Sequence, residues 1–142
     1  IYDDSGSMNS ILIDSILKND TNKITRWDEL KYFSDVAIQL LTSLYPIEID
    51  CYFLNRPPVK NIKDYKDLDV HFEQIPDGYT PLKRVLSQVI NENSKSSMNG
   101  AENLLIIIVT DGEPSDDKGV PDIASFKQAL IDRPDYVFTT IV

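Results

Sequence analysis

The sequence predicts an α/β fold: a doubly wound, mostly parallel sheet with helices on both faces. Two observations predict it. Segments with the apolar pattern of strands alternate along the chain with segments whose apolar residues recur at helical spacing. One strand-like segment, Leu104 to Val109, is apolar throughout, as expected for a central parallel strand that is covered on both faces.

Length and composition indicate one domain, which spans residues 1–142. The chain is 42% hydrophobic and 26% charged, and no apolar run approaches the ~20 residues of a membrane-spanning helix. Acidic residues outnumber basic ones by 23 to 14, for a formal net charge of −9. A surface of that sign disfavours nucleic acid and anionic membranes as partners.

The N-terminal third is expected to hold two strands and one helix. Ile1 and Tyr2 look like the end of a strand. Thr25 to Leu44 has apolar residues at helical spacing, Thr25 is a suitable N-cap, and Pro46 follows the helix. Ile47 to Leu54 alternates apolar and polar residues, which predicts a strand.

The middle of the chain is less regular. The stretch from Asp64 to Gln74 fits both strand and helix periods, and we expect a short helix there, preceded by an edge strand near Val59 to Ile62. Leu82 to Ile90 has clear helical spacing, whereas Asn91 to Gly100 is polar and is expected to form a loop.

Three elements complete the predicted alternation. They are the apolar strand Leu104 to Val109, a helix around Ile123 to Ile131 that ends before Arg133-Pro134, and a strand over Tyr136 to Val142.

The clearest candidate for a functional site is the segment Asp3-Asp4-Ser5-Gly6-Ser7, which reads Asp-x-Ser-x-Ser. One carboxylate and two hydroxyls are spaced two residues apart across a turn that contains glycine, so their oxygens can face one point. Oxygen ligands of this kind suit a hard cation such as Mg²⁺. Taken alone, the segment is more typical of an ordinary turn rich in Ser and Asp than of a metal site.

Two later segments strengthen this prediction. Thr80 lies in Asp77–Leu82, where we expect it to be the N-cap of a helix with Pro81 at the first helical position. Asp111 lies in Val109–Pro114, directly after the apolar strand. In a doubly wound sheet, ligands bind beyond the carboxyl ends of the strands, so the three segments are expected to meet at one edge.

In this order, the three segments resemble the metal-ion-dependent adhesion site (MIDAS) of the von Willebrand factor A (VWA) domain. The matching features are Asp-x-Ser-x-Ser, a Thr in a Thr-Pro-Leu-type loop, and Thr-Asp-Gly. The resemblance spans nearly the whole chain and implies the Rossmann-like VWA fold. It also implies a segment of a longer protein, because the family's first strand is usually longer than Ile1 and Tyr2, and the family continues beyond the strand predicted at Tyr136 to Val142.

The resemblance implies a function and a ligand set. The function is a non-catalytic protein-interaction module in which a divalent cation binds an acidic residue of a partner protein, often as part of a larger assembly. The rim of the site would include Asp4, Tyr79 and Glu113, with Tyr79 placed to contact the ligand or to narrow access to the metal. The implied metal ligands are Asp3, Ser5, Ser7, Thr80 and Asp111.

The chemistry of this ligand set fits that role. Only two of the five residues are charged, so three hydroxyls would leave much of the cation's charge uncompensated and a position open for an incoming carboxylate. Mg²⁺ prefers six oxygens in an octahedron and usually keeps waters. Mn²⁺ would also suit the site, and Ca²⁺, which prefers more oxygens at longer distances, would suit it less well.

Two other classes of function stay open on the sequence. A Mg²⁺-dependent phosphohydrolase resembling the haloacid-dehalogenase type would use Asp3 as nucleophile, but Ser5 occupies the place of its second Asp and is a poor proton donor or acceptor. A hydrolase using Ser5 or Ser7 with His71 lacks a Gly-x-Ser-x-Gly elbow. Both of these are enzymes; the second class of function is a structural VWA domain whose metal site is empty.

Three further features complete the sequence analysis. Met8 to Ile24 is longer than the matching connection in many family members, and it is either a loop insertion that packs its own apolar residues or a partner-contact element. Cys51 is the only cysteine and is expected in the core, so the lack of a disulfide framework favours an intracellular protein. His71 is expected to be structural or exposed.

Overall fold

The computed structural model describes residues 1–13, 23–44, 49–97 and 103–142, and it shows a mixed α/β protein. The helical segments are η1 (Gly6–Asn9), α2 (Arg26–Leu44), η2 (Tyr65–Leu68), α3 (Asp69–Phe72), α4 (Leu82–Ser97) and α5 (Ile123–Ile131), of which η1 and η2 are 3₁₀ helices. The strands are β1 (Ile49–Cys51), β2 (Val59–Ile62), β3 (Leu104–Ile108) and β4 (Val137–Ile141).

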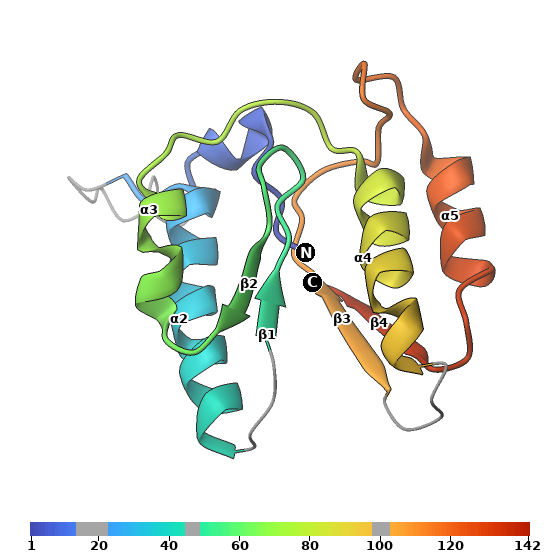
Figure 1. The fold of residues 1–142 in the computed structure, drawn as a ribbon. Helices are drawn as coiled ribbons and strands as arrows, with labels where there is room; N and C mark the ends of the chain where they lie inside the picture. The colour runs from blue at the N-terminus through green and yellow to red at the C-terminus, as the bar shows by residue number, and fades with distance from the viewer. Residues whose placement is uncertain (14–22, 45–48, 98–102) are drawn as a thin grey trace.

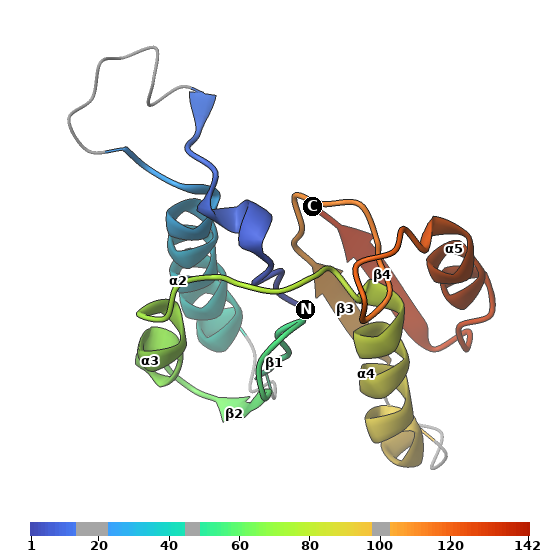
Figure 2. The same ribbon diagram turned by 90° about the horizontal axis from the view of Figure 1, so that it is seen from above.

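The strands form two small sheets. β1 and β2 pair antiparallel, with an irregular register between Ile49 and Cys51, whereas β3 and β4 pair parallel, with Leu104 opposite Val137. Helices α2 and α3 lie on one side of the strands, and α4 and α5 lie on the other (Figures 1 and 2).

The N-terminal segment lies between the two sheets. Tyr2 forms parallel bridges with both Phe53 and Val109. Its amide donates to the carbonyl of Tyr52 at 2.8 Å, and the amide of Asp3 donates to the carbonyl of Val109 at 2.9 Å. The chain that follows Tyr2 therefore emerges between the segments that leave β1 and β3, which brings the first motif next to the third.

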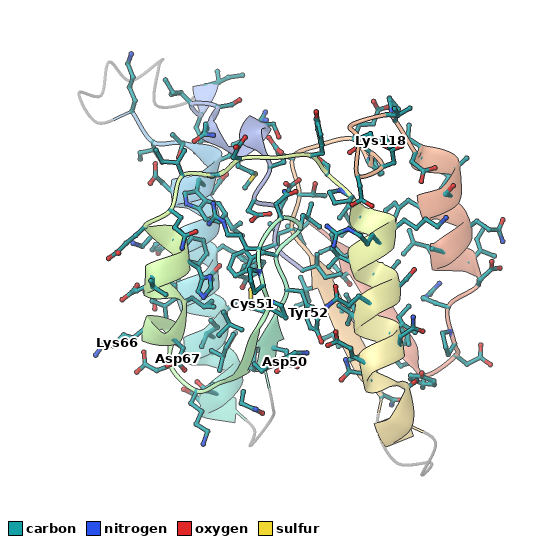
Figure 3. The ribbon with its side chains drawn as sticks, turned by 45° about the horizontal axis from the view of Figure 1, so that its top comes forward. Asp50, Cys51, Tyr52, Lys66, Asp67 and Lys118 are labelled. Carbon is teal, nitrogen blue, oxygen red and sulfur yellow. The ribbon has the colours of Figure 1, made fainter. Side chains whose placement is uncertain are left out.

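Two hydrophobic clusters cover the two sides of the strands. Cys51 and Phe53 pack with Trp27 of α2 and its neighbours, whereas Tyr52 and Leu54 pack with residues of α4, α5, β3 and β4. Successive side chains of an extended chain point to opposite faces, so one segment supplies both clusters. Figure 3 labels Cys51 and Tyr52 in the middle of the molecule, between the two pairs of helices.

Most of the predicted elements are confirmed. The helix after Thr25 begins with the expected cap, since the amide of Asp28 donates to Thr25 Oγ1 at 3.2 Å and the amide of Thr25 donates to Asp28 Oδ2 at 2.8 Å. The edge strand β2, the short helices η2 and α3, and the later α5 and β4 lie where the sequence predicted them. Pro46 and the start of the strand predicted from Ile47 lie outside the described residues.

The prediction of a polar loop from Asn91 to Gly100 is wrong for its described part, because α4 continues to Ser97. Polar side chains do not end a helix by themselves, and no Gly or Pro interrupts this stretch before Gly100. Two pairs along the helix support the extension: Gln88 Nε2 donates to Glu92 Oε1 at 2.8 Å, and Asn93 Nδ2 donates to the carbonyl of Val89 at 2.8 Å.

The prediction that Leu104 to Val109 is covered on both faces is also wrong. Ile106 and Ile108 are buried, but Leu105 is 60% exposed, and so is its partner on β4, Phe138, at 53%. A continuous apolar run predicts a strand but does not reveal which of its faces another element covers.

The segment Met8 to Ile24 is described only at its two ends. Met8 is buried in the cluster on the α2 side, and Ile11 forms an antiparallel bridge with Thr25. Ile13, by contrast, is 72% exposed. The middle of the segment, residues 14–22, lies outside the described residues.

Candidate metal centre

The three predicted segments meet at one end of the strands. Ser7 Oγ donates to Asp111 Oδ1 at 2.7 Å, and Thr110 Oγ1 donates to Asp3 Oδ2 at 2.6 Å, which joins the first segment to the third. Backbone bonds join the first segment to the second, since the amide of Gly6 donates to the carbonyl of Gly78 at 3.2 Å. Residues that are about a hundred positions apart thus share one site.

Hydroxyls and carboxylates converge within this site. Ser5 Oγ and Ser7 Oγ are 3.0 Å apart. A methyl group added to Gly112 would lie 3.3 Å from Thr80 Oγ1 and 3.7 Å from Asp3 Oδ2. The oxygens of Thr80 and Asp3 therefore flank the same small space, which stays open because residue 112 has no side chain.

Thr80 is held by the start of α4. Its amide donates to Ser115 Oγ at 3.0 Å. The amide of Val85 donates to the carbonyl of Pro81 at 3.3 Å, so the helix begins at Leu82, one residue later than predicted. Such a shift is within the usual variation of helix ends, and it places Thr80 one residue before the cap position instead of at it.

The site has a buried floor and an open side. The side chains of Asp3 and Ser5 are almost fully buried, and Thr80 is 8% exposed, whereas Ser7 lies at the surface. The carboxylate of Asp3 is held by the amide of Ser5 at 2.9 Å and by the Thr110 hydroxyl. These donors fix the orientation of the carboxylate and stabilise its negative charge.

Asp4, expected at the rim, points into the protein instead and has no exposed surface. Its Oδ1 accepts from the amide of Asn55 at 2.8 Å, and Arg56 Nε lies 3.2 Å from its Oδ2. Burial raises the pKa of the Asp4 carboxyl above its usual value, and the contacts with Asn55 and Arg56 oppose that rise. Asp4 therefore belongs to the support of the first segment, not to an accessible rim.

The other two rim residues are exposed beside a pocket of about 300 Å³. The pocket is lined in part by Ser5, Ser7 and Thr80, and Tyr79 and Glu113 also line it. Tyr79 is 54% exposed, so both its predicted roles, contact with a ligand and restriction of access, are sterically open.

Sequence reasoning did not single out four residues that shape the site: Arg26, Asn55, Thr110 and Ser115. Thr110 could have been found, because it directly precedes Asp111 in the third segment. Arg26 pairs with Asp111 Oδ2 across 85 positions of sequence, and no local pattern announces such a contact.

The kinds of side chain at the site determine which atoms could hold a cation. Within the ranges that the structure describes, no three His, Cys, Asp or Glu side chains form a group that could hold a metal ion. A cation at this edge would therefore rely on hydroxyl oxygens together with the two carboxylates.

The chain was compared with known proteins, and no protein-family model, curated protein or solved structure matches it. In the described part of the chain, no helix has both the length and the apolar character needed to cross a membrane.

Proposed function

We propose that this chain is a VWA-like interaction module that binds a divalent cation, Mg²⁺ in the first place, and through it an acidic residue of a partner protein. The observation that carries the proposal is the convergence of hydroxyl and carboxylate oxygens from three distant segments around the space beside Gly112. The residues that would hold the cation are Asp3, Ser5, Ser7, Thr80 and Asp111.

The donor set fits this cation. Mg²⁺ takes oxygen ligands and binds through few carboxylates, and this site offers two, together with three hydroxyls. When bound, the cation would supply a positive centre that attracts a carboxylate. The chain's own residues would orient the set: Thr110 and the amide of Ser5 hold Asp3, and Ser7 holds Asp111.

We also propose that the two small sheets belong to one doubly wound sheet, in the order β2, β1, N-terminal segment, β3, β4. The parallel bridges of Tyr2 with Phe53 and Val109 support this arrangement, as do the parallel pairing of β3 with β4 and the helices on both sides. The metal would then lie where ligands usually bind in such sheets, beyond the carboxyl ends of the central strands.

We propose a binding role in preference to catalysis. A phosphohydrolase would need a proton donor two residues after Asp3, and the hydroxyl of Ser5 is a weak one. His71, the only histidine, stacks on the ring of Phe53 with a centroid distance of 5.3 Å, and its carbonyl accepts from Arg56 at 2.7 Å. The stacked ring therefore has the contact of a structural side chain, and the backbone of His71 supports Arg56.

The proposal is tested by calorimetric titration of Mg²⁺ into chelator-treated protein. We expect one-site binding to the native chain and none to Asp111→Ala, because this substitution removes one of the two charged ligands. Asp117→Ala is the matched control, since Asp117 is an exposed carboxylate that pairs with Arg84 instead. It removes the same charge and should leave Mg²⁺ binding unchanged.

A second variant tests the space itself. Gly112→Ala adds a methyl group between Thr80 and Asp3 without changing any ligand. We expect it to weaken Mg²⁺ binding while circular dichroism shows an unchanged fold. Equal binding by the native chain, Asp111→Ala and Gly112→Ala would contradict a site at this position.

A further inference from the structure

We propose that Arg26 tunes the charge of the metal site, so that the cation binds weakly alone and more tightly once a partner's carboxylate joins it. This inference rests on the proposed metal site and adds a residue that links metal binding to partner binding. It is carried by the contact between Arg26 and Asp111, which neither the predicted motif nor the proposed ligand set includes.

The two carboxylate oxygens of Asp111 have different partners. Arg26 Nη1 pairs with Oδ2, whereas Ser7 Oγ donates to Oδ1 at 2.7 Å. Ser7 in turn lies 3.0 Å from Ser5 Oγ. The guanidinium is therefore on one side of Asp111 and the candidate ligand hydroxyls are on the other, so Arg26 approaches the site without filling it.

Local structure fixes the position of Arg26. It is the first residue of α2, directly after the Thr25 cap, and its amide donates to the carbonyl of Ser10 at 3.0 Å. The bridge between Ile11 and Thr25 ties the same point to the segment that follows Ser7. Arg26 is thus anchored by its backbone next to the first motif, while its side chain stays 42% exposed to an arriving ligand.

The charges of the site then determine its behaviour. Asp3 and Asp111 carry two negative charges, and Arg26 compensates one of them. A divalent cation would leave the group with one net positive charge, whereas without Arg26 the cation would leave it neutral. Glu113, which lines the pocket, contributes equally in both cases and does not alter this difference.

Two consequences follow from this charge. The guanidinium repels a divalent cation that shares Asp111 with it, which weakens binding of the metal alone. The remaining positive charge attracts a carboxylate, and by linkage a carboxylate that binds the loaded site must tighten the metal by the same factor. Arg26 therefore favours joint binding of metal and partner over binding of metal alone.

The test uses Mg²⁺ alone and Mg²⁺ in the presence of excess acetate, a minimal carboxylate, with calorimetric affinity as the readout. For Arg26→Gln without acetate, we expect Mg²⁺ to bind about tenfold more tightly than to the native chain, a conservative figure for a half-exposed charge. Acetate should tighten Mg²⁺ binding to the native chain and have little effect on Arg26→Gln.

Two control variants separate charge from other effects. Lys118→Gln removes a positive charge from an exposed position on the loop beside the pocket (Figure 3), and it should behave like the native chain if only the charge next to Asp111 matters. Arg26→Lys keeps the charge and should also stay close to the native affinity. Thermal unfolding followed by circular dichroism verifies that each variant is folded.

The outcomes distinguish this inference from the proposed function. If the native chain binds Mg²⁺ and Arg26→Gln binds it equally or less tightly, the charge-tuning role is overturned; weaker binding would mean that Arg26 orients Asp111. The role would also be overturned if Lys118→Gln or Arg26→Lys tightened Mg²⁺ binding as much as Arg26→Gln does. If the native chain binds no Mg²⁺ with or without acetate, the proposed metal site is rejected, and the inference that rests on it is rejected as well.

Discussion

At the scale of single residues, two neighbouring carboxylates show how environment sets role. Asp3 and Asp4 are both fully buried, but they point in different directions. Asp3 faces Thr110 and the candidate metal site, whereas Asp4 faces Asn55 and Arg56. Alternation of side chains in extended backbone separates them, so one carboxylate faces the candidate site and the other supports the fold.

The pair of Asp4 and Arg56 leads to a prediction about stability. Arg56→Leu leaves a buried carboxylate without its cationic partner, and we expect a loss of about 3–5 kcal/mol in the free energy of unfolding. Urea unfolding measures it. Adding Asp4→Asn to Arg56→Leu should recover part of the loss; the remainder reflects the bonds that Arg56 donates to the carbonyls of His71 and Ile75.

The pH dependence of the same variant has a definite sign. Burial gives Asp4 a higher pKa in the folded protein than in the unfolded chain, and loss of Arg56 removes a contact that opposes this rise. The folded state then binds the proton more tightly, so stability falls as pH rises through the interval between the two pKa values. Arg56→Leu should regain stability on acidification toward that interval. If Arg56→Leu lost the same free energy of unfolding with and without Asp4→Asn at every pH, the coupling between Asp4 and Arg56 would be contradicted.

At the scale of elements, the loop 113–121 forms one wall of the pocket and is held by short-range contacts. Asp116 Oδ1 accepts from the amides of Lys118 and Val120 at 2.8 and 2.9 Å, and Ser115 bridges to Pro121. The hydrogen bonds from the amides of Val120 and Lys118 keep the pKa of the Asp116 carboxyl below its usual value. The ring of Tyr79 packs on the turn at Gly119, which fixes the loop against the entrance of α4.

Gly119 is required at that turn for two reasons. Its φ is +80°, and an added Cβ would lie 2.5 Å from Cε1 of Tyr79. We expect Gly119→Ala to destabilise the protein by about 1–2 kcal/mol from the backbone strain alone, with the clash adding to it. Gly6→Ala is the control, because its Cβ would meet only the carbonyl oxygen of Gly78 at 4.0 Å. Equal urea midpoints for the two variants would contradict the packing of Tyr79 on this turn.

At the scale of the whole molecule, the segment from β1 to Leu54 holds the two hydrophobic clusters together. Cys51 and Phe53 enter one cluster, and Tyr52 and Leu54 enter the other. Both helix pairs therefore pack on the same few residues, and the strands that end at the candidate site are supported on both faces. Loss of either cluster should open the core around Cys51.

Cys51 is a reporter of this core. It is 4% exposed, and burial raises the pKa of its thiol to about 12. We expect a thiol reagent at pH 8 to label the folded protein very slowly and the urea-unfolded chain completely. Because the folded pKa lies above the unfolded value of about 8.5, stability should fall as pH rises through that interval. Rapid labelling of the folded chain would show that the core opens around β1.

Much of the secondary structure and the location of the candidate site could be predicted from the sequence. The helix from Arg26 to Leu44, the strand at Leu104 and the meeting of three motif segments follow from local periodicity and from the order of strands and helices. These signals are local or topological: apolar spacing fixes the type of an element, and alternation of elements fixes which loops share an edge.

Only the tertiary structure decided which neighbours each side chain meets. The burial of Asp4, the exposure of Leu105, the packing of Tyr79 on Gly119 and the pairing of Arg26 with Asp111 all depend on segments far apart in the chain. The sequence by itself thus determined the kinds of elements and the chemistry at their ends. Burial and charge pairing arise between elements, because they depend on distances that no local pattern encodes.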